Sequence, residues 1–296
     1  MGTVRANGIE LEYETFGSSS DPALLLVMGL GAQLTSWDER FCRRLADAGF
    51  RVIRYDNRDV GLSTKIDGGG APADLAATLA EAAQGGRIEA PYLIEDMADD
   101  AAGLLDGLDI DAAHVVGASM GGMIAQAIAI RHPERVLSLC SIMSTTGDRS
   151  VGQPSPEAGQ ALLSARPRTA EEAGELSLQV SRVIGSKGFP LDEERIRRRA
   201  EDAFRRSSYP DGFARQVLAI MASPDRTPDL AKVEAPTLVI HGDVDPLVTP
   251  SGGEATARAV PGAELLMVPG MGHDLPEGAW PMIIEAIVAN ARRRRR

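Results

Sequence analysis

The stretch HVVGASMG, residues 114–121, joins a short apolar strand pattern to a helical pattern that continues to Arg131. It contains the motif Gly-x-Ser-x-Gly with Ser119 at its centre. Glycines flank this serine because a tight turn leaves no room for Cβ atoms. Such a turn lifts the hydroxyl out at the strand end, beside a helix N-terminus that favours developing negative charge. The alternative is a glycine-rich turn with an incidental serine, but the strand and helix patterns around it favour a nucleophile.

Strand patterns alternate with helical patterns on both sides of this motif. The predicted strands are residues 9–15, 23–28, 51–55, 114–117, 136–143, 237–240 and 264–268. The predicted helices are residues 36–48, 94–108, 120–131, 252–259 and 277–291. Such alternation is typical of an α/β fold with a mostly parallel sheet and helices on both faces. Residues 9–15 alternate apolar and polar side chains, which predicts a half-exposed antiparallel edge strand.

The alternation stops between residues 145 and 231, where four helical patterns follow one another at 157–164, 169–184, 192–206 and 212–221. Asp192 is a suitable N-cap for the third. This segment is too long for a simple crossover, so we expect a helical cap (145–231) inserted at the carboxyl edge of a core made of residues 1–144 and 232–291. Residues 65–91 predict a loop with one short helix. The five arginines at 292–296 predict a disordered tail.

A nucleophilic serine needs a base, and the chain has four histidines. His273 lies in the glycine-flanked segment GMGHD just after the last predicted strand, which places it at the carboxyl end of the sheet. His132 ends the helix that follows the serine, and His114 begins the strand at the opposite end from it. His241 follows a strand and is the only rival. We therefore expect His273 to be the base.

The acid that orients this base should follow a strand between the serine and the histidine. The segment HGDVDP, residues 241–246, offers Asp243 and Asp245. We prefer Asp245, in the turn beyond the strand end, and keep Asp243 as the alternative. A metal site made of His241, Asp243 and Asp245 is a weaker reading, because no second cluster completes it.

The order serine, aspartate, histidine, each after a strand, resembles the α/β-hydrolase superfamily along nearly the whole chain. The segment RYDNRDVGLS, residues 54–63, is similar to the superfamily's loop RxDxRGxGxS, with Asp59 where glycine is usual. This Asp59 and the opening LLLVMGLGAQLTSW, residues 24–37, resemble the bacterial esterase branch that includes aclacinomycin methylesterase.

The resemblance implies an oxyanion hole made of the backbone N–H groups of Leu30 and Met120. Many relatives have His-Gly-x where this chain has Met28-Gly29-Leu30; the donors are backbone groups, so losing the histidine need not abolish the hole. A substrate pocket around the site is expected to involve Gly29, Trp37, Met143 and Met271, together with apolar residues of the cap.

The function predicted from these residues is hydrolysis of a carboxylic ester of a small or medium hydrophobic substrate through an acyl-enzyme. Three alternatives use the same fold: a cofactor-free perhydrolase or haloperoxidase, a carbon–carbon bond hydrolase, and a ligand-binding relative with little turnover. A serine at position 119 argues against a haloalkane dehalogenase, which has aspartate there. We expect no cofactor and no metal.

The charge excludes other classes of partner. The net charge is −11, and without the arginine tail 26 basic residues face 42 acidic ones, about −16. Such a body repels phosphate backbones, so we expect no nucleic-acid partner. The arginines of residues 192–206 alternate with acidic residues, which predicts a solvated face with i,i+4 ion pairs; binding of an anionic substrate is the lesser alternative.

No apolar run approaches the roughly 18 residues that span a bilayer, so we expect no membrane partner. Cys42 and Cys140 lie far apart without metal-ligand spacing, and the first residues lack the apolar region of a signal peptide. These features predict a cytoplasmic protein. A homo-oligomer is compatible with the sequence.

Overall fold

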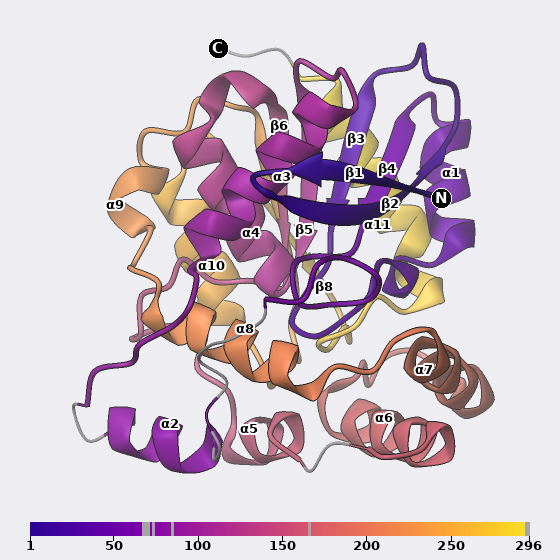
Figure 1. Ribbon diagram of the computed structural model, residues 1–296. Coiled ribbons are helices and arrows are strands. Elements are labelled where there is room, and N and C mark those ends of the chain that lie inside the picture. Colours follow the sequence, from indigo (N-terminus) through magenta and orange to yellow (C-terminus); the bar gives the residue numbers. More distant parts are fainter. Residues whose placement is uncertain (67–71, 73–74, 84–85, 165–166, 294–296) are drawn as a thin grey trace.

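The structure, a computed structural model, describes residues 1–66, 72, 75–83, 86–164 and 167–293 (Figure 1). The glycines at 68–70 and the last three arginines, for which a loop and a disordered tail were predicted, lie outside these residues.

An eight-stranded sheet with the order β1-β2-β4-β3-β5-β6-β7-β8 forms the centre of the described molecule. Its strands are β1 (Gly2–Ala6), β2 (Ile9–Phe16), β3 (Ala23–Val27), β4 (Arg51–Tyr55), β5 (Ala113–Ala118), β6 (Val136–Ile142), β7 (Thr237–Gly242) and β8 (Glu264–Val268). The two pairs that involve β2 are antiparallel, and all the others are parallel. The predicted mostly parallel α/β sheet is confirmed.

The prediction that residues 9–15 form an edge strand was wrong, because β1 pairs with β2 and takes the edge position. The turn between them is Asn7-Gly8, and both residues have positive φ angles of 46° and 81°. A two-residue hairpin turn of this kind requires left-handed backbone, which Asn-Gly adopts readily. This dipeptide was the sequence signal for the missed strand.

Helices cover both faces of the sheet (Figure 1). Apart from the inserted helices, the chain forms α1 (Glu39–Asp47), α2 (Leu75–Ala83), α3 (Ile94–Gly107), α4 (Met120–Arg131), α9 (Thr227–Leu230), α10 (Pro250–Ala259) and α11 (Trp280–Ala291), with 3-10 turns at Leu34–Ser36, Pro133–Arg135 and Glu277–Ala279. Of these, α2 lies below the sheet in Figure 1 rather than on one of its faces. α1 and α11 pack on one face, and α3, α4 and α10 on the other.

Alternate residues of the central strands pack into two hydrophobic clusters, one on each face of the sheet. Along β3, Leu24 and Leu26 join the cluster under α1 and α11, whereas Leu25 and Val27 join the cluster under α3 and α4. Successive side chains of a strand point to opposite faces, so a strand buried on both faces must be apolar throughout. This explains why ALLLV has no polar alternation.

Four inserted helices lie between β6 and α9 in the chain: α5 (Pro156–Leu162), α6 (Ala170–Ile184), α7 (Glu193–Arg206) and α8 (Pro210–Ala222). In Figure 1 they occupy a layer below the sheet. The Asp192 side chain accepts a hydrogen bond from the N–H of Arg195, which confirms the predicted N-cap.

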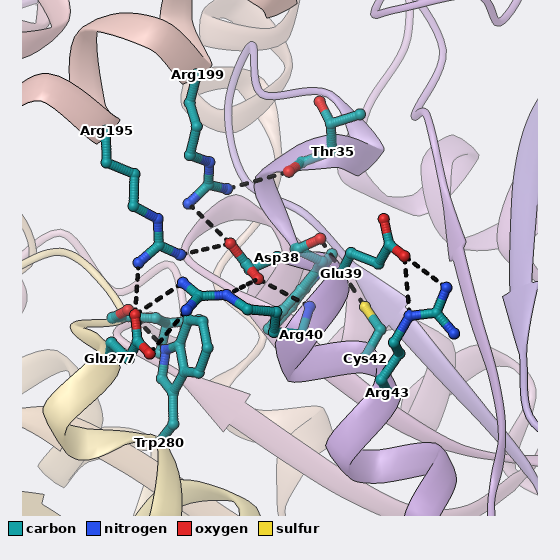
Figure 2. A network of polar contacts seen from close by, with 12 residues as sticks. Thr35, Asp38, Glu39, Arg40, Cys42, Arg43, Arg195, Arg199, Glu277 and Trp280 are labelled. Carbon is teal, nitrogen blue, oxygen red and sulfur yellow. Dashed lines mark hydrogen bonds and ion pairs between the residues drawn. The ribbon is translucent and has the colours of Figure 1, made fainter.

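The arginines of α7 differ from the prediction of a solvated face. Arg197 and Arg205 do form i,i+4 pairs within the helix. Arg195 instead binds Asp38 and Glu277 of the core, and Arg199 donates to the carbonyls of Thr35 and Ser36 (Figure 2).

Arg206, at the end of α7, binds Asp56 in the loop after β4. A helix pattern cannot distinguish arginines that pair along the helix from arginines that reach another element.

None of the helices among the described residues is long and apolar enough to cross a membrane.

Candidate active site

Ser119 occupies a strained turn between β5 and α4. Its φ and ψ are 57° and −122°, outside the regions that residues with a side chain prefer. A Cβ at Gly117 would lie 1.9 Å from the Gly121 carbonyl oxygen, and a Cβ at Gly121 would lie 2.1 Å from that of Val27. The two glycines are therefore required by close backbone packing, as the motif predicted. Ser119 remains half-buried, at the N-terminus of α4.

The structure brings Ser119, His273 and Asp245 together from three separate segments. Nε2 of His273 lies 2.9 Å from Oγ of Ser119, and Nδ1 lies 2.7 Å from Oδ2 of Asp245. The other oxygen of Asp245 accepts hydrogen bonds from the backbone N–H groups of Leu247 and Val248. These bonds orient the carboxylate toward the imidazole.

The alternative acid and base take other roles. Oδ1 of Asp243 accepts a hydrogen bond from Gly270 N–H at 2.6 Å, so this carboxylate holds the loop of the histidine rather than its ring. His241 is fully buried and donates from Nε2 to the Val248 carbonyl, and burial lowers its pKa. Among the described residues, no group of three or more His, Cys, Asp or Glu side chains is placed to hold a metal ion.

The loop that carries His273 is bonded to the segment after α6. His273 N–H donates to the Ile184 carbonyl at 2.7 Å, and Gly272 N–H donates to Oγ of Ser186 at 2.9 Å. Ser186 also donates to the carboxylate of Asp274. The inserted segment thus helps to place His273, a role that the sequence did not reveal because these residues are 86 to 89 positions apart.

The loop after β3 lies directly against Ser119. A Cβ at Gly29 would lie 3.0 Å from Cβ of Ser119. Leu30 follows in this loop, and Met120 follows Ser119. Among the described residues, neither of their backbone N–H groups has a hydrogen-bond acceptor in the protein. Both are therefore available as donors to a substrate oxygen.

The unusual Asp59 binds the inserted helices to the core. Its backbone has a positive φ of 68°, which explains why glycine is usual here. Its two carboxylate oxygens accept hydrogen bonds from Nε and an Nη of Arg215 on α8, and from the hydroxyl of Tyr92. Burial opposes ionisation, but these bonds hold the pKa of Asp59 below its ordinary value. They also raise the pKa of Arg215.

The residues expected to line a pocket are all buried. Trp37 is 1% exposed and stacks on Phe41, with ring centroids 5.7 Å apart, in the cluster under α1 and α11. Met271 is 0% exposed in the same cluster. Gly29 lies against Ser119, and Met143 directly follows β6, whose Ile142 carbonyl accepts a hydrogen bond from Ser119 N–H. Trp37 and Met271 therefore present core packing rather than open surface.

A cleft of about 500 Å³ lies elsewhere, between α7 and the core. It is lined by Thr35, Asp38, Glu39, Arg40, Arg54, Asp192, Arg195, Arg198, Arg199 and Glu277. Figure 2 shows part of this network, in which arginines and carboxylates bind one another. No residue of the Ser119 site lines it, so this cleft does not mark the site of the chemistry.

The fold and the tight strand-to-helix turn at Ser119 define the class of this protein as a hydrolase. The chain belongs to the α/β-hydrolase fold family, whose model matches residues 22–278. It is 30% identical to rhodomycin D methylesterase DnrP of Streptomyces peucetius, over 96% of this chain and 95% of that protein.

Two further matches extend over most of the chain. It is 31% identical to 2-hydroxy-6-oxononadienedioate/2-hydroxy-6-oxononatrienedioate hydrolase of Burkholderia vietnamiensis (strain G4 / LMG 22486), over 90% of this chain and 85% of that protein. The crystal structure of the enol-lactonase from Burkholderia xenovorans LB400 matches with a TM-score of 0.74 and 25% identity, covering 98% of this chain and 99% of that one. The protein is a hydrolase, and the likeness to the methylesterase supports action on esters.

Proposed function

We propose that this protein is a serine hydrolase that cleaves a carboxylic ester of a small or medium hydrophobic substrate through an acyl-enzyme. The observation that carries the proposal is the chain of hydrogen bonds from Ser119 through His273 to Asp245, at 2.9 and 2.7 Å. A serine is a weak nucleophile unless a base accepts its proton and a third group orients that base.

In the first half-reaction, Nε2 of His273 accepts the proton of Ser119 as Oγ attacks the ester carbonyl. The N–H groups of Leu30 and Met120 donate hydrogen bonds to the oxyanion, and the carboxylate of Asp245 stabilises the imidazolium. His273 then gives the proton to the departing alcohol, which leaves an acyl group on Ser119.

In the second half-reaction, His273 removes a proton from water as the water attacks the acyl carbonyl. Collapse of the second tetrahedral intermediate releases the acid and returns the proton to Ser119. The strained backbone at Ser119 supports this proposal, because such strain is found where a turn holds a reacting group in place.

We propose further that residues 145–231 form a cap that limits which ester reaches Ser119. Two sets of contacts support this role. α8 packs over the loop after β3, where a Cβ on Gly31 would lie 2.6 Å from the ring of Phe213. The segment after α6 binds the histidine loop, where the N–H groups of Lys187 and Gly188 donate to the Gly270 carbonyl.

The test is turnover of a series of p-nitrophenyl esters by the wild-type protein and by Ser119→Ala. We expect the wild type to hydrolyse short and medium acyl chains and to be labelled by a fluorophosphonate at Ser119. The substitution should remove both activities while leaving the circular dichroism spectrum unchanged. Retained turnover in Ser119→Ala would overturn the proposal.

A second candidate is hydrolysis of a carbon–carbon bond by the same residues, which is supported by the likeness to the Burkholderia vietnamiensis hydrolase. The two candidates differ in the leaving group: carbon–carbon bond hydrolysis expels a carbanion equivalent, whereas ester hydrolysis expels an alkoxide. A screen of a vinylogous diketone beside the esters separates them. Faster turnover of the diketone would favour the second candidate.

A further inference from the structure

The segment after α6 lies in direct backbone contact with the histidine loop, residues 270–274. A Cβ on Gly272 would lie 2.5 Å from the carbonyl oxygen of Ile184, and a Cβ on Gly188 would lie 2.7 Å from Cα of Gly270. Side chains at these positions would therefore force the two segments apart. Because the glycines allow this approach, short polar groups of one segment can bond the backbone of the other.

Ser186 bonds this loop on both sides of His273. Its Oγ accepts a hydrogen bond from Gly272 N–H at 2.9 Å and donates to Oδ1 of Asp274. Its own backbone N–H donates to the same carboxylate oxygen at 2.9 Å. Ser186 is 8% exposed, so these bonds are shielded from water, which strengthens them. One serine therefore anchors the residue before the histidine and the residue after it.

The backbone of His273 is held by the same segment. Its N–H donates to the Ile184 carbonyl at 2.7 Å, which fixes the peptide that precedes it. The bonds of Ser186 fix the neighbours on either side, so these contacts together set the position from which the imidazole extends. The ring must lie 2.9 Å from Oγ of Ser119 and 2.7 Å from Oδ2 of Asp245 at the same time. Both distances depend on where the backbone of the histidine is held.

We propose that Ser186 and Asp274 are positioning residues for the catalytic base: their shared hydrogen bonds hold the residues on either side of His273, so that its imidazole reaches Ser119 and Asp245 together. The inserted segment then contributes to the rate of the reaction as well as to the choice of ester. This inference deepens the proposed function and rests on it. Among the described residues, the partners of the two side chains are each other and the N–H groups of the two segments, not the reacting atoms.

An effect of the charge of Asp274 on the imidazolium is the alternative to positioning. Burial raises the pKa of Asp274 above its ordinary value, whereas the hydrogen bonds from Ser186 favour the ionised form. Asp274→Asn removes the charge but keeps an oxygen that accepts both hydrogen bonds, and Asp274→Ala removes the acceptor as well. These two substitutions therefore separate a positioning role from an effect of charge.

A displaced base should lower kcat with little change in KM. General acid–base catalysis by a positioned side chain contributes about 100- to 10,000-fold. The bonds of His273 to Asp245 and Ile184 do not depend on the replaced side chains, so only part of this contribution should be lost. The base acts in both half-reactions, so acylation and deacylation should slow together and leave KM nearly constant.

The experiment compares Ser186→Ala and Asp274→Ala with the wild type on one p-nitrophenyl ester. We expect kcat to fall about 10-fold in each, with KM within about two-fold of the wild type. In Asp274→Asn, which keeps the acceptor, kcat should stay within about two-fold of the wild type. Unchanged kcat in either alanine variant, or a change confined to KM, would overturn the proposal. Equal falls in Asp274→Asn and Asp274→Ala would assign the effect to charge and would also overturn it.

The double variant Ser186→Ala/Asp274→Ala tests whether the two residues act as a unit. Losses from the two partners of one contact are not additive, so the kcat of the double variant should equal that of Ser186→Ala. A fall of about 100-fold, the product of the two single losses, would show independent roles and contradict the pair.

The matched control is Ser223→Ala, which removes another hydroxyl that joins the inserted helices to the core. Oγ of Ser223 accepts from Ile94 N–H at 2.9 Å and donates to the Ala219 carbonyl, and neither bond involves the histidine loop. We expect its kcat to equal that of the wild type. An equal fall in Ser223→Ala and Ser186→Ala would show that any loosening of the inserted helices lowers kcat, and would contradict a specific role for Ser186.

Each alanine variant covers the case in which the other does not fold, because one removes the pair from the inserted segment and the other from the histidine loop. The rate of fluorophosphonate labelling separates this proposal from the proposed function. We expect the two alanine variants to be labelled about 10-fold more slowly than the wild type. An unlabelled wild type would contradict Ser119 as the nucleophile and, with it, both proposals. A labelled wild type whose rate is matched by Ser186→Ala would overturn the role of Ser186 alone.

Discussion

Asp243 and Asp245 lie two positions apart, and their carboxylates have different hydrogen-bond partners. Asp245 is 2% exposed, faces the imidazole of His273 and has its second oxygen held by two backbone N–H groups. Asp243 binds the N–H of Gly270 at the beginning of the histidine loop. The same residue type therefore orients a ring in one case and a loop in the other.

Replacement of Asp245 by Asn is expected to lower kcat by about 10⁴-fold, because an amide cannot stabilise the imidazolium and favours the wrong tautomer of His273. The matched variant Asp243→Asn retains an acceptor for Gly270 N–H, and its kcat should stay within about 10-fold of the wild type. Steady-state kinetics on one ester would check both. A greater loss in Asp243→Asn would reverse the assignment of the acid.

Asp59 stands where the superfamily loop usually has glycine, so a charged side chain is present on a backbone with positive φ, which is strained for any residue other than glycine. Replacing it with Gly relieves the positive φ but leaves the guanidinium of Arg215 buried without its carboxylate. Removing one partner of a buried pair typically costs about 3 to 5 kcal/mol. The loss of the counterion should therefore outweigh the relief of strain.

We predict that Asp59→Gly lowers the free energy of unfolding by about 3 kcal/mol and that Arg215→Met in the same chain restores a large part of it. Urea unfolding of the wild type, both single variants and the double variant measures this coupling. Equal stability of Asp59→Gly and the wild type would show that the ion pair contributes nothing net.

At the scale of the element, α7 is joined to the core by charge rather than by apolar burial. None of the residues of α7 is fully buried. Arg195 reaches Asp38 at the start of α1 and Glu277 before α11, and its guanidinium lies 5.5 Å from the ring of Trp280 (Figure 2). The apolar stripe of α7 is narrow and only partly buried, so charged partners of this kind help to hold the helix against the core.

Arg195→Ala is therefore expected to increase hydrogen exchange in α7 by about 10-fold while exchange in α3 stays constant. Arg197→Ala is the matched control, because Arg197 pairs with Glu175 and Glu193 of the inserted helices themselves. Exchange measured by mass spectrometry distinguishes the two. Equal exchange in both variants would contradict a role for Arg195 as an anchor.

At the scale of the whole molecule, burial of ionisable groups makes stability depend on pH. His114 in β5 is 8% exposed, packs edge-on against Phe50 and contacts Oγ of Ser138. Burial lowers its pKa from 6.5 to about 4. Between these values the unfolded chain binds a proton that the folded protein does not, so stability is full above about pH 6.5 and falls as the pH falls toward 4.

His114→Asn should remove this dependence. When the pH is lowered from 7 to about 4.5, protonation of His114 in the unfolded chain should lower the free energy of unfolding of the wild type by about 2 to 3 kcal/mol. The variant lacks this contribution, so its free energy of unfolding should fall by about 2 to 3 kcal/mol less. The quantity to compare is the change in the free energy of unfolding between the two pH values, rather than the stability of the variant at pH 7. Denaturant unfolding at both values measures it, and parallel losses in the two proteins would contradict the assignment.

Much of the fold was predictable because it depends on local patterns. Apolar runs such as ALLLV mark strands buried on two faces, and Asp192 marks the start of α7. The hairpin partner of β2 was missed because β1 is short and its signal lies in the turn, Asn7-Gly8. The purpose of the α7 arginines was missed because their partners are more than 80 positions away.

The sequence by itself determined the order of most strands and helices, the family and the turn that presents Ser119, because spacing and glycine positions act between neighbouring residues. Only the tertiary structure showed that Asp245 contacts His273 whereas Asp243 contacts Gly270, and placed Trp37 in the core. It also showed that Ser186 and Gln216 of the inserted segment bind the histidine loop and the turn at residues 29–32. Hydrogen bonds between distant segments depend on how those segments pack in three dimensions, and such packing produces no hydrophobic periodicity or local motif that can be recognised in the sequence.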